Sequence, residues 1–306
     1  MPTIRLGTRA SKLALTQSNW VKAQLESLGN EVQLIEIKTE GDVKTGPLAQ
    51  IGGQGLFTKR LQIALLESEI DLAVHSLKDL PTEDHPDLKI AAVPPRENTA
   101  DALIGRDGVN DLASLPEGAK VGTGSVRRAA QLLHLRPDLQ IFDIRGNVDT
   151  RLQKLTSEGF DAIVLACAGL NRMGLADEIS YAFAETELLP AVGQGALGLE
   201  VRGADQATIA AVGQLNDEAS FHRAMAERSM LRRLFAGCLA PVGAVTVVDS
   251  GQLTLTGVVL STDGVTRINA TKSLPVAESA ELGVAVAELL LEQGADALLK
   301  SQGPEV

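Results

Sequence analysis

The chain has 306 residues, of which 44% are hydrophobic, enough for two or three packed domains. Its 28 basic and 39 acidic residues give a formal net charge of −11, which disfavours nucleic acids and anionic membranes as partners. Cys167 and Cys238 are the only cysteines, so no disulfide framework is expected. No signal segment precedes the first strand pattern and no apolar run approaches the roughly 20 residues of a membrane span, so we expect a cytoplasmic protein.

Strand and helix patterns alternate through the first two hundred residues. Strands are expected at 3–6, 31–38, 72–74, 102–104, 120–122, 140–143 and 162–165. Helices are expected at 11–28, 57–67, 126–135 and 148–158. The glycine-rich segment 39–55 between them predicts a mobile loop. This alternation favours α/β layers with mainly parallel strands.

The last ninety residues have a different pattern. A long helix is expected at 217–236, three alternating strands at 242–248, 252–260 and 265–272, and a final helix at 277–293. Asp249-Ser250-Gly251 and Thr262-Asp263-Gly264 are hairpin signals between these strands, and Gly237 is expected to cap the long helix. The pattern predicts an α+β module, with domain boundaries near 94–98 and 190–195.

Arginines stand at a predicted helix start in Gly122-Thr123-Gly124-Ser125-Val126-Arg127-Arg128. Ser125 is a good N-cap, so Arg127 and Arg128 fall in the first turn, where the positive end of the helix dipole disfavours each cation by about 0.3–1 kcal/mol. An anion bound there would offset this penalty, because free amides and both guanidinium groups would converge on it. A solvated arginine pair is the competing interpretation.

Other arginines repeat this placement. Arg145 lies in a strand-to-helix loop, Arg151 follows the expected cap Asn147, Arg9 follows the first strand, and Arg172 stands near the end of another strand–helix unit. Open α/β sheets bind ligands beyond the carboxyl ends of their strands, where these loops fall. Arginine suits planar carboxylates held by two hydrogen bonds, so the pattern predicts a cleft that binds several carboxylates or phosphates.

Competing motifs are absent from the sequence. There is no Gly-x-x-x-x-Gly-Lys-Ser/Thr loop, and the glycine string from Gly193 to Gly198 follows Leu189-Pro190 rather than a strand. The histidines show no metal-ligand spacing with each other or with the cysteines: His75, His85, His134 and His222. We therefore expect no metal.

These segments closely resemble the porphobilinogen deaminase family. The resemblance runs from Arg5 to about Ala244. Its motifs, in order, are Gly7-Thr8-Arg9, Gly52-Gly53-Gln54-Gly55-Leu56-Phe57, 74–81, 122–128, Arg145-Gly146-Asn147-Val148, 189–196 and Gly237-Cys238. It implies two α/β domains like those of periplasmic binding proteins, formed by 1–95 with 196–215 and by 96–195. It also implies a smaller C-terminal α+β domain, 216–306, which carries the cofactor cysteine.

The resemblance also implies an activity. Family members are transferases that join four porphobilinogen molecules head to tail, release ammonia at each addition, and free hydroxymethylbilane by hydrolysis for tetrapyrrole and heme biosynthesis. A dipyrromethane cofactor is held by a thioether to a cysteine that Cys238 matches. Cys167 ends an apolar strand and is interpreted as a small core residue. A cytoplasmic monomer acting on a small-molecule substrate is expected, without nucleic acid or membrane.

Site residues follow from the same resemblance. Asp79 matches the catalytic aspartate, which can stabilise positive charge on a pyrrole and move protons, although by itself Lys78-Asp79 would pass as an exposed turn ion pair. Implied cofactor-binding residues are Cys238, Ser76, Lys78, Thr123, Ser125, Arg127, Arg128, Arg145 and Gly146. Implied substrate-binding residues are Arg9, Gln17, Arg145, Arg151, Arg172 and Gln194.

Three departures from the family pattern stand near these residues: Gly124 replaces a common serine, Gln54 a common lysine, and Leu239-Ala240 follows the cysteine. None of them changes Asp79, Cys238 or the main arginines, so an active enzyme is expected. One alternative is a non-catalytic protein of the same two-lobed fold that binds carboxylate ligands. Another is a regulator with such an effector domain, which would need a DNA-binding segment.

Overall fold

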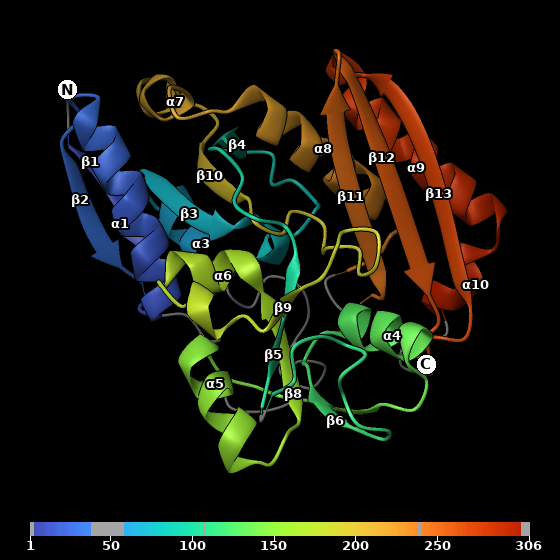
Figure 1. Ribbon diagram of the computed structural model, residues 1–306. Coiled ribbons are helices and arrows are strands. Elements are labelled where there is room, and N and C mark those ends of the chain that lie inside the picture. Colours follow the sequence, from blue (N-terminus) through green and yellow to red (C-terminus); the bar gives the residue numbers. More distant parts are fainter. Residues whose placement is uncertain (1–2, 38–57, 107, 238–239, 301–306) are drawn as a thin grey trace. The chain divides into compact units, whose positions relative to one another are not determined.

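A computed structural model of the chain describes residues 3–37, 58–106, 108–237 and 240–300 (Figure 1). The predicted mobile loop 39–55 with Gln54, and Cys238 with Leu239, lie outside the described residues. The chain forms two compact units, Met1–Glu97 with Ala196–Phe221 and Asn98–Gly195 with His222–Val306. The finer division into three domains stays a prediction.

A five-stranded mixed sheet forms the first unit, in the order β2-β1-β3-β10-β4. Its strands are β1 (Ile4–Thr8), β2 (Val32–Glu36), β3 (Leu72–Ser76), β4 (Leu88–Ala92) and β10 (Leu197–Arg202). The first three are parallel, and β10 runs antiparallel between β3 and β4. Strand β10, which follows the whole α/β sheet of the second unit in the sequence, therefore completes the sheet that contains the N-terminal strand β1.

Helices cover both faces of this sheet. They are α1 (Lys12–Ser27), α3 (Lys59–Leu66) and α7 (Gln206–Gly213). Leu72 and Val74 of β3 share a core with α1 and α7, whereas Ala73 belongs to a second core with Leu61 of α3. Because side chains alternate along a strand, His75 falls on the α3 side of the sheet, as Ala73 does.

The second unit contains a sheet of the same pattern, ordered β7-β6-β8-β5-β9. Its strands are β5 (Asp101–Gly105), β6 (Lys120–Gly122), β7 (Gln140–Phe142), β8 (Ala162–Ala166) and β9 (Tyr181–Ala182). Here β7, β6 and β8 are parallel, and β5 is antiparallel to β8 and β9. The helices are α4 (Val126–Leu135), α5 (Val148–Ser157) and α6 (Cys167–Arg172), with a short 3-10 turn, η3 (Ala176–Glu178).

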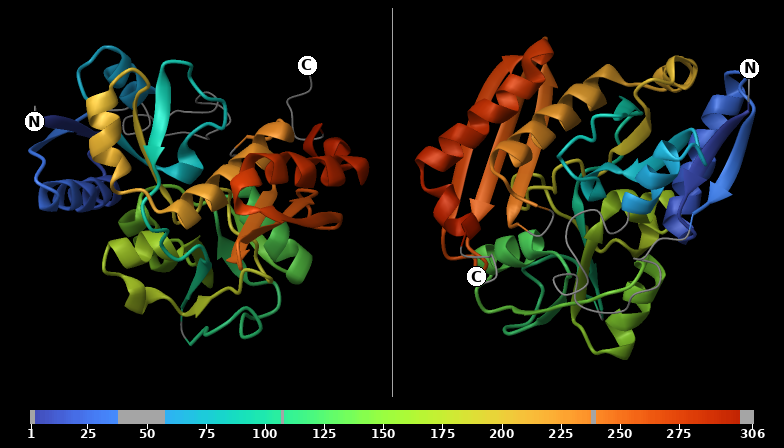
Figure 2. Two further views of the ribbon diagram at one scale, coloured as in Figure 1. Left: turned by 90° about the horizontal axis from the view of Figure 1, so that it is seen from above. Right: turned by 180° about the vertical axis from the view of Figure 1, so that it is seen from behind.

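A three-stranded antiparallel sheet follows in the same unit, built from β11 (Val242–Asp249), β12 (Gln252–Leu260) and β13 (Arg267–Pro275). Its helices are α8 (Glu218–Arg233), α9 (Ser279–Glu292) and α10 (Ala295–Lys300), with the 3-10 turn η4 (Val276–Glu278). Helices α8 and α9 pack on one face of the sheet (Figure 2). They cross closely at Gly283, where a Cβ atom would lie 2.2 Å from the Ala226 carbonyl oxygen. Two α/β sheets and a smaller α+β part confirm the expected fold class.

The end of α8 differs from the prediction. The helix stops at Arg233, and Phe235, with a φ of 50°, takes the left-handed position that Gly237 was expected to take. Phe235 N donates to Arg232 O at 3.0 Å and Ala236 N to Leu231 O at 3.2 Å, the two bonds of a Schellman motif. The predicted cap was wrong because burial of Leu231 and Ala236 in the core fixes the turn earlier than the glycine does.

Candidate functional site

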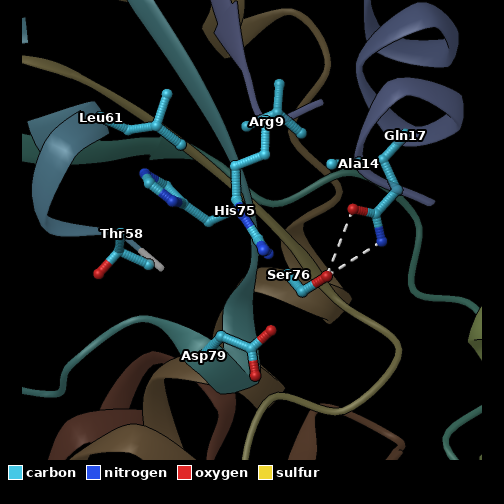
Figure 3. A pocket seen from close by; sticks show the side chains of 9 residues that line it. Arg9, Ala14, Gln17, Thr58, Leu61, His75, Ser76 and Asp79 are labelled. Carbon is cyan, nitrogen blue, oxygen red and sulfur yellow. Dashed lines mark hydrogen bonds between the residues drawn. The ribbon is translucent and has the colours of Figure 1, made fainter. Parts of the chain in front are cut away.

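Four of the predicted site residues line one pocket in the first unit (Figure 3). Arg9 follows β1, Gln17 lies on α1, Ser76 ends β3, and Asp79 ends the 3-10 turn η2 (Leu77–Asp79). The pocket thus lies at the carboxyl ends of two parallel strands, the edge at which open α/β sheets bind ligands. The sequence placed these residues correctly relative to the strands.

Hydrogen bonds and packing fix this pocket. The buried Gln17 side chain donates from Nε2 to Ser76 Oγ at 3.0 Å, which joins α1 to β3. Leu77 is buried and its amide donates to Ala196 O at 3.0 Å, while a Cβ atom on Gly198 would lie 2.7 Å from Leu77 Cδ1. The absence of a side chain at Gly198 therefore leaves room for Leu77, which anchors the turn that carries Asp79. Lys78 is half-buried in this turn and does not belong to the pocket lining.

The structure adds a residue that sequence reasoning missed. His75 lines the same pocket, and its Nε2 lies 2.9 Å from Glu200 Oε2 on β10. Gln62 Nε2 on α3 donates to the other oxygen of Glu200 at 3.0 Å. His75 and Glu200 are both buried, so the hydrogen bond between them offsets part of the cost of removing these polar groups from water. The sequence signal was weak, because the two residues stand far apart in the chain and were examined only for metal-ligand spacing.

In the second unit, Arg127 and Arg128 converge on a carboxylate of the protein itself. Ser125 caps α4 by accepting from Arg128 N at 3.4 Å, as predicted. Arg128 donates from Nε and Nη2 to Asp101 Oδ1 at 2.9 and 2.7 Å, and Arg127 Nη1 lies 2.8 Å from Asp101 Oδ2. The competing interpretation, a solvated pair, is wrong, since both side chains are buried. The anion on which the two guanidinium groups converge is Asp101.

This buried cluster holds two positive charges against one negative charge. Burial raises the pKa of Asp101, but the neighbouring guanidinium groups outweigh it and hold that pKa well below its usual range, while burial lowers the pKa of Arg127. Gln194 joins the cluster, with Nε2 donating to Asp101 Oδ1 at 2.8 Å and to Thr99 O at 2.7 Å. Arg127 Nε is buried and has no hydrogen-bond partner among the described residues.

A second group of predicted residues surrounds the start of α5. Arg145 is half-exposed and donates from Nε to Asp143 Oδ2 at 2.8 Å, and Arg151 Nε donates to Gly146 O at 2.8 Å. A Cβ atom on Gly124 would lie 2.9 Å from Ile144 O and 3.7 Å from Arg145 Cζ. Glycine at this position therefore lets the loop after β6 approach the loop after β7 closely. This close approach gives a structural reason for glycine where the family commonly has serine.

The remaining predicted residues are more scattered. Thr123 is buried and its Oγ1 accepts from Ser125 N at 3.3 Å. Arg172 ends α6 and donates from Nη2 to Gly195 O at 2.7 Å. Cys167 is fully buried. Within the described ranges, no cluster of His, Cys, Asp and Glu side chains could hold a metal ion, and none of the helices there is long and apolar enough to cross a membrane.

Comparison with known proteins places this fold and these sites in a class. Residues 4–210 match the family model "Porphobilinogen deaminase, dipyromethane cofactor binding domain". Residues 221–292 match the model "Porphobilinogen deaminase, C-terminal domain". The protein is therefore an α/β protein of the class that carries a dipyrromethane cofactor, with a smaller C-terminal part.

Individual relatives agree with the family models. The porphobilinogen deaminase of Geobacter metallireducens is 49% identical over 97% of this chain and 93% of its own length. That of Syntrophotalea carbinolica is 48% identical over 97% of this chain and 95% of its own length. Among solved structures, the methionine binding protein MetQ matches 74% of this chain and 94% of its own at 11% identity and a TM-score of 0.47. The chain belongs to the porphobilinogen deaminase family.

Proposed function

We propose that this protein is a hydroxymethylbilane synthase, a transferase that polymerises four porphobilinogen molecules head to tail on a covalently attached dipyrromethane. Each addition releases ammonia, and hydrolysis frees hydroxymethylbilane for tetrapyrrole and heme biosynthesis. The observation that carries the proposal is the family match over residues 4–210, which include Asp79 and every predicted arginine. A cytoplasmic monomer is part of the proposal and rests on the family resemblance.

The second unit offers a donor set that fits the carboxylates of a dipyrromethane. The cluster around Asp101 has an excess positive charge, and Arg127 Nε is a buried donor with no described partner. Buried charges of this kind are stabilised by a bound anion. When bound, the dipyrromethane supplies the free pyrrole α-carbon to which substrate units are added. Its proposed holders are Thr123, Ser125, Arg127, Arg128, Arg145 and Gly146, with Ser76 and Lys78 from the first unit and Cys238 as the point of thioether attachment.

The pocket of the first unit suits the substrate and the chemistry. Arg9 and Gln17 provide donors for the acetate and propionate of porphobilinogen, and Arg151, Arg172 and Gln194 are the further proposed substrate-binding residues. The Asp79 carboxylate accepts the pyrrole N–H and stabilises the positive charge that develops on the ring as ammonia leaves. Such electrostatic assistance contributes about 10²–10³ in rate.

The intact mass of the purified protein tests this proposal. The wild-type chain is expected to carry an added mass of two linked pyrrole units and to gain further pyrrole increments on brief exposure to porphobilinogen. A Cys238→Ser variant should lack both, because it removes the attachment atom. An Asp79→Asn variant, which keeps the shape of the side chain, should retain the added mass and gain almost no increments.

The same masses separate the alternatives. An unmodified wild-type chain that gains nothing from porphobilinogen would favour the non-catalytic carboxylate-binding protein, which has no use for Asp79 or Cys238. Normal elongation by Asp79→Asn would remove the catalytic role of that carboxylate but leave the rest of the proposal in place.

A further inference from the structure

His75 and Glu200 form a buried imidazole–carboxylate pair at the wall of the Asp79 pocket. Glu200 Oε2 lies 2.9 Å from His75 Nε2, and their side chains are only 6% and 2% exposed. With Glu200 ionised, its oxygens can only accept hydrogen bonds, and Nε2 then carries the proton that joins the two groups. The other ring nitrogen, Nδ1, makes no hydrogen bond with a described residue, and the ring lines the pocket (Figure 3).

The packing fixes this pair in place. Gln62 of α3 donates a hydrogen bond to the other carboxylate oxygen of Glu200. Glu200 lies on β10, which pairs with β3 in a register that places Gly198 opposite His75. A carboxylate bonded to one ring nitrogen sets the tautomer of the imidazole, orients the ring, and stabilises the imidazolium that forms when the other nitrogen takes up a proton. The arrangement has the parts of a general base: an oriented acceptor, a counter-charge and an adjacent pocket.

The proposed reaction needs such a base in addition to Asp79. A carboxylate that stabilises a positively charged pyrrole loses that capacity once it is protonated. Formation of each new C–C bond, however, expels a proton from the pyrrole α-carbon that is attacked. The two demands conflict when one carboxylate must meet both, and they are compatible when a second group takes the proton.

We propose that His75, oriented by Glu200, is the general base that takes the proton from the pyrrole α-carbon during chain elongation; this inference rests on the function proposed above. The C–N bond of the protonated aminomethyl group breaks, so that the nitrogen leaves as ammonia with the electron pair and the methylene carbon stays on the ring as the electrophile. The α-carbon of the neighbouring substrate-derived ring forms the new C–C bond and loses its proton to His75 Nδ1. His75 then returns the proton to the departing ammonia, which leaves as ammonium, so that charge and atoms balance.

A His75→Gln variant tests this role. Glutamine can still donate to Glu200 from a position near that of Nε2, but it offers no basic nitrogen to the pocket, so the fold should persist. We expect kcat to fall by roughly 100-fold, with KM changed far less. With porphobilinogen deuterated at its free α-carbon, the isotope effect on turnover should increase relative to the wild type, because removal of that proton becomes slower.

Gln62→Leu is the matched control. It removes a hydrogen bond from the same carboxylate on the side away from His75, so it should lower stability without changing the isotope effect. Glu200→Gln removes the counter-charge but keeps an acceptor for Nε2, and it should reduce kcat and increase the isotope effect as His75→Gln does. If His75→Gln keeps wild-type turnover, or slows without any change in isotope effect, His75 is only a structural residue and the inference is overturned.

An NMR measurement gives an answer independent of turnover. Only four histidines are present, so ¹⁵N spectra of the histidine-labelled protein can be assigned with His75→Gln. We expect the Nε2–H tautomer for His75, with Nδ1 unprotonated, and a proton on Nδ1 instead would overturn the inference. If the wild type adds no pyrrole units at all, the proposed function fails. If the wild type elongates but the His75 results are negative, this inference fails alone.

Discussion

Each of the two mixed sheets places a buried acid on its antiparallel fourth strand, but the partners of these acids differ. In the first unit, Glu200 of β10 faces the imidazole of His75. In the second, Asp101 of β5 faces the guanidinium groups of Arg127 and Arg128. Guanidinium remains charged at every physiological pH, so the second cluster is a fixed positive centre. Imidazole has a second ring nitrogen that can accept a proton while the first is bonded to the carboxylate, so the first pair has the parts for proton transfer.

The comparison also separates arginines that the sequence treated alike. Arg127 and Arg128 are buried against a carboxylate, whereas Arg145 is half-exposed and its partner Asp143 is exposed. Arginines at helix starts therefore divide into those that face a buried counter-ion and those that face an exposed one. The difference lies in whether the fold supplies a buried counter-ion.

The largest expected effect is on stability and concerns Asp101→Asn. Removing the charge leaves two buried guanidinium groups without their counter-ion, and breaking a buried pair in this way costs about 3–5 kcal/mol. Urea unfolding should show this loss, whereas Asp143→Asn, next to the accessible Arg145, should stay within about 1 kcal/mol of the wild type. Equal, small losses in both variants would erase the distinction between the two kinds of arginine.

An intermediate effect is expected at Asp71 in the first unit, which also faces two arginines but is less deeply enclosed. Burial raises the pKa of its carboxyl, but hydrogen bonds from Arg5 and Arg202 outweigh this and lower it to about 2. Because the folded value lies below the unfolded one, the contribution is complete above about pH 4 and is lost as the pH falls towards 2.

Unfolding measured from pH 7 to pH 2 checks this contribution. Asp71→Asn should lower the unfolding free energy by at most about 2 kcal/mol at neutral pH and flatten its decline below pH 4. If the unfolding free energy of the variant falls with pH in parallel with that of the wild type, the interactions of Asp71 with Arg5 and Arg202 do not influence folding.

The smallest effect on stability is expected for Arg145→Leu. Its exposed ion pair with Asp143 contributes less than about 1 kcal/mol, so unfolding should barely change. Elongation should instead stall at an intermediate chain length, because one carboxylate holder is missing, and mass spectra after exposure to porphobilinogen would show it. A uniform loss of all covalent species would point to failed cofactor loading instead.

Much of the fold could be predicted from local pattern. The strand-to-helix loops, the Ser125 cap and the hairpins were readable because they depend on neighbouring residues; Ser250 and Gly251, for example, take the left-handed conformations a tight hairpin needs. The partners of Arg127 and His75 could not be predicted from the sequence. Asp101 and Glu200 reach them through antiparallel strand pairing between distant segments, which leaves no periodic trace in the sequence.

The position of β10 also has a consequence for how the chain is made. This strand lies between β3 and β4, yet residues 197–202 are synthesised only after all five strands of the second unit's α/β sheet. Until then β3 has an open edge and the polar groups of β3 and β4 lack their partners, a state prone to pairing with other chains. On the ribosome, the first sheet can therefore be completed only after the α/β sheet of the second unit has been synthesised, although its first strand is the first to emerge.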